Sequence, residues 1–294
     1  MNMTAICICN ASAKYQFTVR TFNLFRCKEC SLLFVFPRHD ASNIYDADYF
    51  QGGTHGFGFT DYESDKTASR GYLHQYLRWL KKLSLKNGSN KLLDVGAANG
   101  YFVEMAARVG FEASGIEISS QAVEWAKKLG RNVEKSSLEE YADPSKFVIL
   151  TSLDVLEHIE NPKEFLGSAH KKLVTNGYLL INVPNSGSLF AKLSGEKWHA
   201  IVPPEHWFFF NRKSLKLALE STGFSVIKMR SISKSFNFSY IYLTILNSPQ
   251  IPNFVKSSMK ILAPIANGPI GKLKIYLPLF DNLTVIARAK NLTN

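Results

Sequence analysis

The sequence predicts an α/β protein whose core is a doubly wound, seven-stranded, mostly parallel sheet. Short apolar segments alternate with helical segments between residues 91 and 231, which is the pattern of repeated β-α-β units. The first of these units passes from strand to helix through a run of small residues. With 46% hydrophobic and 20% charged residues among 294, the composition supplies a large core and excludes a disordered chain.

Local signals predict each element in chain order. Apolar residues at helical spacing predict a helix over 72–80, and a second helix is expected over 100–109. Ser119 is placed to cap a helix that runs to residue 129. Asn161, followed by proline, and Asn211 are placed to cap two more. The predicted strands occupy 91–95, 111–118, 131–135, 147–153, 177–183, 224–229 and 282–288.

The composition divides the chain into five segments. Residues 1–36 hold all four cysteines, and residues 37–90 contain a glycine-rich loop, predicted as a linker or lid, and the leading helix. Residues 91–234 form the α/β core. Residues 235–281 separate the last two strands by far more than a hairpin requires, so we predict an apolar, basic insertion without a helical crossover of ordinary length. Residues 282–294 supply the last strand and a tail.

The positive charge is concentrated toward the C-terminus. The formal net charge is +11, and residues 211–294 hold 12 of the 35 Lys and Arg but only 2 of the 24 Asp and Glu. A basic end suggests contact with a phosphorylated substrate, a membrane surface or nucleic acid, although a solvated lysine-rich surface fits equally well. Because neither a disulfide scaffold nor a spanning helix is indicated, we expect a cytoplasmic protein with reduced thiols.

A ligand site is indicated where the first core strand ends. Asp94 closes this strand, and small residues follow it up to Gly100, which lets backbone N–H groups approach a ligand. An acidic residue at this point would repel a pyrophosphate but suits a cationic or hydroxyl-bearing ligand. Glu117 ends the next strand, where a carboxylate can accept hydrogen bonds from two ribose hydroxyls. The alternative is a strand-turn-helix corner that binds nothing.

Three segments together resemble the successive motifs of class I S-adenosylmethionine-dependent methyltransferases: Leu92–Gly100, Gly115–Ile118 and Leu153–Ile159. The resemblance covers residues 85 to 231, with alanine at position 98 where the family often has glycine. It implies a Rossmann-like fold that binds S-adenosylmethionine, whose sulfonium cation suits acidic residues. The implied cofactor-binding residues are Asp94, Gly96, Ala97, Ala98, Asn99, Gly100, Glu117, Ile118, Ser137, Leu138, Leu153 and Asp154.

The resemblance also implies a role for each part of this set. Asp94 orients the amino-acid part of the cofactor, and residues 96–100 pack under its methionine moiety. Glu117 holds the ribose, with Ile118 against the adenine. Ser137 and Leu138 meet the adenine edge, while Leu153 and Asp154 close the cofactor from the other side.

Two histidines are candidates for the chemistry. Methyl transfer is an in-line displacement that requires alignment and often the removal of a proton from the acceptor. His158 follows the fourth core strand and His206 follows the fifth, both at the edge where α/β sheets bind ligands. We favour His206 as the general base, because Glu205 and aromatic residues flank it. The alternatives are a capping role for His158 and a packed loop position for His206.

Neighbouring residues bear on the type of methylation. Glu205-His206 resembles the Glu-His pair of zinc-bearing sugar C-methyltransferases, but Pro203 stands where that family has tyrosine. The run from Asp154 to Ile159 is closer to quinone-type O-methyltransferases. The motif of amino-methylating nucleic-acid enzymes is absent after the fourth core strand.

The cysteines form two close pairs, Cys7-x-Cys9 and Cys27-x-x-Cys30. Four thiolates in two close pairs suit a structural, tetrahedral Zn²⁺ site, and the alternative is a set of free thiols in a strand-rich lobe. The segment that follows resembles the linker between a zinc-ribbon-like lobe and the methyltransferase core of sugar C-methyltransferases. By that resemblance Tyr49 and Phe50 form part of a lid over the cofactor.

The sequence therefore predicts a methyltransferase that moves a methyl group from S-adenosylmethionine to an oxygen or carbon of a small-molecule or lipid-linked acceptor. Relatives with such a lobe suggest a sugar or glycan precursor. The insertion over 235–281 is predicted as a lid or as a peripheral contact with the inner membrane surface. We do not expect a nucleic-acid partner; the alternatives are an RNA methyltransferase, which would use the lobe and the basic end on phosphates, and a non-catalytic relative.

Overall fold

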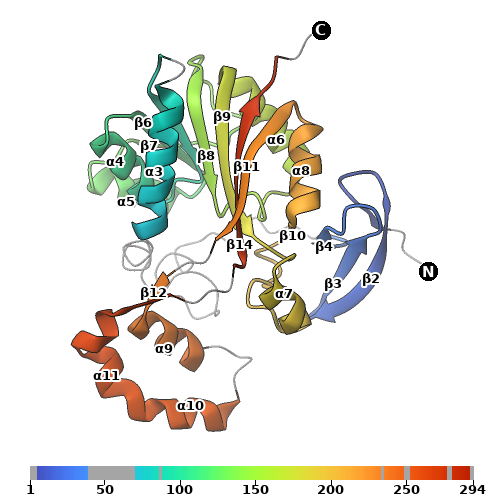
Figure 1. The fold of residues 1–294 in the computed structure, drawn as a ribbon, viewed down its shortest axis with the longest axis vertical. Coiled ribbons are helices and arrows are strands. Elements are labelled where there is room, and N and C mark those ends of the chain that lie inside the picture. Colours follow the sequence, from blue (N-terminus) through green and yellow to red (C-terminus); the bar gives the residue numbers. More distant parts are fainter. Residues whose placement is uncertain are drawn as a thin grey trace.

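A seven-stranded sheet forms the centre of the computed structural model, which describes residues 5–38, 70–85, 88–232, 235–247, 252–276 and 280–291. The strand order is β11-β14-β9-β8-β5-β6-β7 (Figure 1). The last strand in the sequence, β14, runs antiparallel to its neighbours β9 and β11, and the pairings among β5 to β9 are parallel. The predicted doubly wound, mostly parallel α/β sheet is confirmed.

All seven predicted core strands are present, and three extend beyond the predicted bounds, β14 by a single residue. β9 begins directly after a helix, ahead of the predicted start, and β11 continues past the predicted end while pairing with β14. Every residue from 147 to 152 in β8 is buried, which explains its uninterrupted apolar pattern. The strands are β5 (Lys91–Val95), β6 (Glu112–Glu117), β7 (Val133–Lys135), β8 (Phe147–Leu153), β9 (Leu173–Pro184), β11 (Phe224–Ile232) and β14 (Asn282–Ala289).

Helices cover both faces of this sheet. Leu180 belongs to the apolar cluster that includes Tyr76 of α3, whereas its neighbours in β9 pack in a second cluster with Phe165 of α6 and Leu215 of α8. Because successive side chains of a strand point to opposite faces, the two clusters lie on opposite sides. These helices are α3 (Arg70–Ser84), α4 (Tyr101–Arg108), α5 (Ser120–Lys128), α6 (Pro162–Lys172) and α8 (Arg212–Glu220).

The predicted N-caps of three helices are confirmed. The Ser119 hydroxyl accepts a hydrogen bond from the backbone N–H of Ala122, and the Asn161 side chain accepts one from Glu164. Asn211 forms a full capping box with Ser214. One short helix, α7 (Leu189–Ser194), was not predicted, and a 3₁₀ turn, η1 (Gly195–Lys197), extends it.

The cysteine-bearing lobe is an antiparallel sheet in the order β1-β2-β3-β4-β10. Its first four strands are β1 (Ala5–Ile6), β2 (Ser12–Val19), β3 (Phe22–Cys27) and β4 (Leu33–Val35). The fifth, β10 (Phe208–Phe209), belongs to the core segment that follows His206, and Phe208 pairs with Phe34. The lobe is therefore joined to the core by a shared sheet.

The insertion contains short helical segments, which the sequence did not indicate. Two short strands, β12 (Ser235–Asn237) and β13 (Lys274–Tyr276), pair at its base. Figure 1 shows the unit below the sheet, at the end where the parallel strands finish. Among the helices that the structure describes, none is long and apolar enough to cross a membrane. Its helical segments are α9 (Phe238–Asn247), α10 (Asn253–Met259), η2 (Lys260–Leu262), α11 (Ala263–Asn267) and η3 (Pro269–Lys272).

Most of the predicted linker or lid lies outside the described residues. This applies to the glycine-rich loop over 52–58 and to Tyr49 and Phe50.

Candidate functional site

The turn after β5 has an unusual backbone. Gly96, Ala98 and Gly100 have φ values of 71°, 48° and 74°, which lie in the left-handed region. Ala98 carries a Cβ in this left-handed conformation, which costs about 1 kcal/mol. The turn directs the backbone N–H of Ala98 to Glu117 at 2.9 Å.

Gly96→Ala tests how tightly this turn is packed. A Cβ at Gly96 would lie 2.4 Å from Cγ2 of Val155, whereas Gly130, with a similar φ of 69°, has nothing within 4 Å of its Cβ position. We expect Gly130→Ala to lower the free energy of unfolding by about 1 kcal/mol through backbone strain, and Gly96→Ala by about 1–3 kcal/mol more through overpacking. Urea denaturation measures both, and equal losses would show that the Val155 contact is unimportant.

Two buried carboxylates flank the turn. Glu117, at the end of β6, is 8% exposed, and its two oxygens accept hydrogen bonds from the backbone N–H groups of Ala98 and Ser119 at 2.9 and 3.0 Å. Burial raises the pKa of Glu117, while these backbone hydrogen bonds oppose the rise. Asp94, in β5, accepts a hydrogen bond of 2.6 Å from the Thr151 hydroxyl. The predicted juxtaposition of Asp94, the turn and Glu117 is present.

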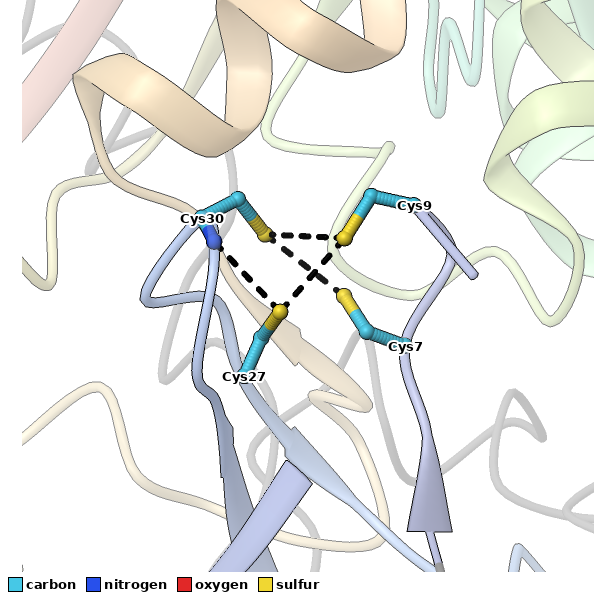
Figure 2. Close-up of side chains that lie close together, drawn as sticks. All are labelled: Cys7, Cys9, Cys27 and Cys30. Atoms are coloured by element: carbon cyan, nitrogen blue, oxygen red, sulfur yellow. Dashed lines mark hydrogen bonds between the residues drawn. The ribbon is translucent and has the colours of Figure 1, made fainter. Parts of the chain in front are cut away.

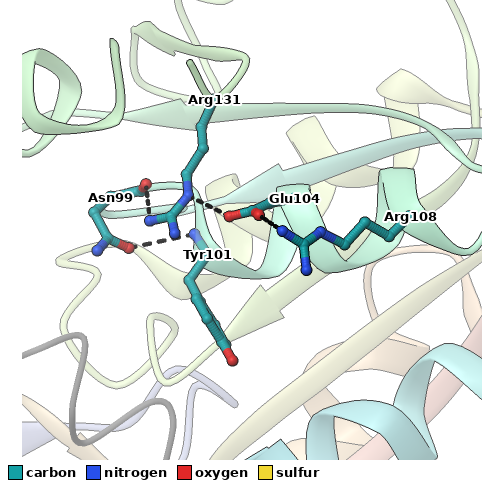
Figure 3. A network of polar contacts seen from close by, with 5 residues as sticks. All are labelled: Asn99, Tyr101, Glu104, Arg108 and Arg131. Carbon is teal, nitrogen blue, oxygen red and sulfur yellow. Dashed lines mark hydrogen bonds and ion pairs between the residues drawn. The ribbon is translucent and has the colours of Figure 1, made fainter. Parts of the chain in front are cut away.

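A polar network supports the far side of the turn (Figure 3). Arg131 donates to the backbone oxygen of Asn99 at 3.1 Å and pairs with Glu104 at 2.7 Å, and Glu104 also pairs with Arg108. The Asn99 side-chain oxygen accepts a hydrogen bond from the N–H of Tyr101 at 3.3 Å, but its buried Nδ2 has no partner among the described residues. A buried amide without a partner is expected where a ligand supplies one.

The other predicted cofactor residues differ in accessibility. Ile118 is 56% exposed beside Glu117, which leaves an apolar surface open to a flat ring. Ser137 is partly buried and forms a hydrogen bond with Glu140, and Leu138 is buried in the core. Leu153 ends β8, and Asp154 follows it with a φ of 59°.

The sequence analysis missed a buried polar cluster beside Asp154. Asn182 donates to Asp154 at 2.5 Å and accepts from Thr284 at 2.9 Å and from the Tyr76 hydroxyl at 3.2 Å. Tyr76 lies in the helix predicted over 72–80, where the apolar spacing gives no sign of a polar contact. The available signal was Asn182 itself, an amide residue in the buried run 177–183 of β9. The cluster joins α3, β9 and β14 at the carboxyl edge of the sheet.

The two candidate histidines meet at the same edge. The ring centroids of His158 and His206 lie 4.6 Å apart at an interplanar angle of 75°. Nδ1 of His158 lies 2.8 Å from the backbone oxygen of Glu205, and Nδ1 of His206 lies 2.8 Å from that of Ala200. Because a carbonyl oxygen only accepts hydrogen bonds, Nδ1 carries the hydrogen in each ring. The Nε2 of a neutral ring is then the proton-accepting atom.

Burial controls the charge of this region. It lowers the pKa of His158, and it lowers that of His206 to about 3, with the neighbouring His158 as the next cause. Asp154 opposes both shifts without reversing them. Burial also raises the pKa of Glu205 to about 7, against the influence of Arg20. Both rings are therefore neutral at pH 7.

The four predicted cysteines are brought together in the lobe. Figure 2 shows their sulfur atoms turned toward a common centre. The Sγ–Sγ distances are 3.5 Å for Cys7–Cys30, 3.4 Å for Cys9–Cys27 and 3.7 Å for Cys9–Cys30, and none of the four is in a disulfide. Four sulfurs at the ordinary Zn–S distance of about 2.3 Å from a tetrahedral ion lie about 3.8 Å apart. The observed Sγ–Sγ distances are close to this value.

Hydrogen bonds connect the cysteine lobe to the histidine pair. The backbone N–H of Trp207, next to His206, donates to the backbone oxygen of Glu157 at 2.9 Å. The backbone oxygen of Trp207 accepts a hydrogen bond of 3.0 Å from Val35 of β4. The segment that carries His206 is thus held between the lobe and the residue before His158.

The chain matches known proteins over its core. Residues 68–229 match a family model described as a methyltransferase domain. The chain is 35% identical over 112 residues to a mitochondrial ubiquinone biosynthesis O-methyltransferase of Schizosaccharomyces pombe, covering 35% of this chain and 40% of that protein. It is 31% identical over 117 residues to a ubiquinone biosynthesis O-methyltransferase of Thiobacillus denitrificans, covering 37% and 50%. The chain spans about half the length of the curated relatives it matches.

Solved structures show the same fold. A SAM-dependent methyltransferase from Archaeoglobus fulgidus superposes with a TM-score of 0.50 at 21% identity, covering 76% of this chain and 93% of that one. A protein from Bacillus halodurans described as a methyltransferase superposes with a TM-score of 0.51 at 16% identity, covering 73% and 99%.

Proposed function

This chain belongs to the methyltransferase-domain family, and from that premise we propose that it transfers a methyl group from S-adenosylmethionine to an oxygen of a small-molecule acceptor. The observation that carries the proposal is the pair of buried carboxylates, Asp94 and Glu117, on either side of a left-handed turn. The relatives, which are O-methyltransferases, support the choice of oxygen. Pro203, in place of the tyrosine of the sugar C-methyltransferases, also favours oxygen over carbon.

The residues around the turn fit S-adenosylmethionine. The cradle at Gly96 has no room for a Cβ, and the buried Asn99 Nδ2 lacks a partner among the described residues. Asp94 and the turn would hold the amino-acid part, Glu117 the ribose, and Ile118 the adenine. When bound, the cofactor supplies an electrophilic methyl group on a sulfonium.

The histidine pair is suited to accept the acceptor's proton. A hydroxyl becomes a better nucleophile as a base removes its proton, and both rings are neutral with Nδ1 held by a backbone oxygen. The proton would be taken at Nε2. Because His158 and His206 are in ring contact, a positive charge on one disfavours a charge on the other, so the pair takes one proton at a time.

His206→Ala tests this role, with methylated product measured from methyl-labelled S-adenosylmethionine and a panel of hydroxylated acceptors. We expect kcat to fall about 10²–10⁴-fold while the Kd for S-adenosylmethionine stays within about twofold. Since the neutral form of a histidine with a lowered pKa persists below pH 6.5, wild-type kcat/KM should show no decline as the pH falls through about 6.5. His74→Ala, at an exposed position of α3, is the control. An unchanged kcat in His206→Ala would contradict the assignment.

The cysteine cluster supports a structural zinc ion in a zinc-ribbon-like lobe. All four ligands come from the protein, so no coordination position remains open for catalysis. We assign this role to the lobe of residues 1–36, the cofactor and the chemistry to residues 91–234, and a covering role to the linker of residues 37–90. The lobe's part in the activity is to hold the segment that carries His206.

The helical insertion supports a peripheral contact with an anionic membrane surface. Phe254, Ile261 and Leu273 are 74%, 81% and 63% exposed. Lysines occur among them at 256, 260 and 272, and residues 235–276 contain no Asp or Glu. Apolar side chains next to lysines are typical of segments that lie in a membrane interface.

We expect the protein to co-sediment with phosphatidylglycerol vesicles at low salt. Phe254→Ser combined with Ile261→Ser should weaken this binding about tenfold or more, because each apolar side chain that enters the interface contributes about 1–2 kcal/mol. Leu85→Ser, at a residue that is 74% exposed outside the insertion, is the matched control. Failure of the wild-type protein to bind vesicles would refute the contact.

A further inference from the structure

A cleft of about 740 Å³ lies between the cysteine lobe and the core. It is lined by residues of β2 and β3, the segment after β9, α7 and the first turn of α8. None of the residues predicted to bind the cofactor lines it. Its volume is within the range of about 300–1,000 Å³ that is usual for small-molecule sites.

The cleft is lined by charges of one sign. Arg26 comes from the lobe, Lys192 from α7, and Arg212 and Lys213 from the start of α8. No Asp or Glu is among the lining residues, and within the described part of the chain none of these four cations forms an ion pair with a carboxylate. Cations converging on a cleft from three elements create a positive potential that favours an anion.

Arg26 gives the strongest support for an anion site in the cleft. It is half-buried, and its guanidinium donates only to neutral oxygens, the Gln16 side chain at 3.4 Å and the Ser31 backbone at 3.3 Å. Burial lowers the pKa of Arg26, and no carboxylate opposes this effect. A partly desolvated charge normally has an ionic partner, which here would come from the ligand.

The wall of the cleft that faces Arg26 is formed by the start of α8 and the segment after β9, and hydrogen bonds hold it in place. Arg212 donates to the backbone oxygen of Met229 at 3.3 Å and to the Ser231 hydroxyl at 3.2 Å. Asn185 donates to the same hydroxyl at 3.2 Å. The backbone N–H groups at the start of α8 are already capped by Asn211, so the positive potential comes from the side chains and the helix dipole.

The cleft adjoins the histidine pair through one loop. Trp198 and Ile201 line the cleft, and Ala200, between them, accepts the hydrogen bond from the His206 ring. The adjacent buried carboxylate, Asp281, pairs with His199 at 3.2 Å and does not line the cleft. A ligand held in the cleft therefore contacts the loop that positions His206.

We propose that this cleft binds a diphosphate group of the methyl acceptor, so that the acceptor is a hydroxylated small molecule carrying a diphosphate. The identification of the ligand as the methyl acceptor rests on the proposed methyl transfer, whereas the anion site itself does not. Four cations exceed what a single phosphate dianion would neutralise, and the volume admits a diphosphate together with the group attached to it.

The test is calorimetric titration with inorganic pyrophosphate, UDP and geranyl diphosphate, which separate the bare anion, a nucleotide and an isoprenoid carrier. We expect pyrophosphate to bind and one of the two esters to bind more tightly. Lys192→Gln combined with Arg212→Gln should weaken pyrophosphate binding at least about tenfold, and so should Arg26→Gln, as is usual when charge-assisted hydrogen bonds are lost. Lys216→Gln, an exposed position of α8 outside the cleft, is the charge-matched control for Arg26→Gln.

The test of the anion site can fail or succeed independently of the test of the methyltransferase activity. No pyrophosphate binding, or binding that the cleft variants leave unchanged, would overturn the anion site. Tighter binding of polyuridylic acid than of either ester would overturn the small-molecule assignment in favour of RNA. S-adenosylmethionine is titrated in parallel: its failure to bind would sink the proposed methyl transfer while pyrophosphate binding stands, and the reverse result would sink only the cleft.

Discussion

Glu117→Ala should weaken S-adenosylmethionine binding about 100-fold or more. A buried carboxylate that accepts hydrogen bonds from two ribose hydroxyls contributes about 1.5–3 kcal/mol for each bond, and the loss of about 3 kcal/mol corresponds to a factor of about 100 in Kd. Glu117 is already buried and held by two backbone N–H groups, so its position requires little reorganisation when the cofactor binds. Calorimetric titration of the purified protein measures the change.

Two further variants separate binding from folding. Glu117→Gln retains one acceptor oxygen for the backbone of the turn, and we expect it to bind about tenfold more weakly than wild type. Glu112→Ala lies at the other end of β6, where the side chain is 66% exposed and pairs with Lys91, and it should leave the Kd unchanged. If Glu117→Ala bound the cofactor within about twofold of wild type while unfolding normally, the ribose role would be wrong.

Replacing Cys27 and Cys30 together with serine should abolish bound zinc and most of the methyltransferase activity while leaving cofactor binding intact. Structural zinc sites contribute about 10 kcal/mol or more of binding free energy, so the lobe that carries the four cysteines is strongly destabilised when the metal is lost. Strand β10, next to His206, pairs with β4 of the lobe. Loss of the lobe therefore removes the support of His206, the proposed general base, but leaves Asp94 and Glu117 in place.

Three measurements test these effects of the double serine variant: metal analysis, kcat and the Kd for S-adenosylmethionine. Lys28→Ala changes an exposed residue between the two cysteines and is the control. We expect one zinc per chain in wild type and in Lys28→Ala, and none in the double serine variant. Absence of zinc from the wild-type protein, or full activity in the double variant, would contradict the proposed structural role.

The core could be predicted because its signals are local. The strand over 147–153 is a continuous apolar run because both of its faces are covered, and its observed bounds match those predicted. The caps at Ser119, Asn161 and Asn211 act on N–H groups only two or three residues away. The pairing of Glu117 with the turn follows from the adjacency of parallel strands β5 and β6.

Other features could not be predicted because they join distant parts of the chain. β10 is two residues long and has no strand signal of its own, since pairing with β4 defines it. The insertion forms short helices under a two-stranded base, and its five prolines and apolar residues gave no clear helical period. The cluster of Tyr76, Asn182 and Thr284 joins three elements, so only Asn182 stood out.

The sheet, the turn after β5 and the residue types available for chemistry could be predicted, because each depends on periodicity or on spacing within one β-α unit. How those residues are arranged around one another depends on contacts between distant segments. Packing between distant segments brings His158 and His206 into ring contact, turns four cysteines toward one centre, and places four cations along a cleft that no Asp or Glu of the described residues lines. The physical reason is that burial and electrostatic potential arise from packing between segments that the chain order keeps far apart.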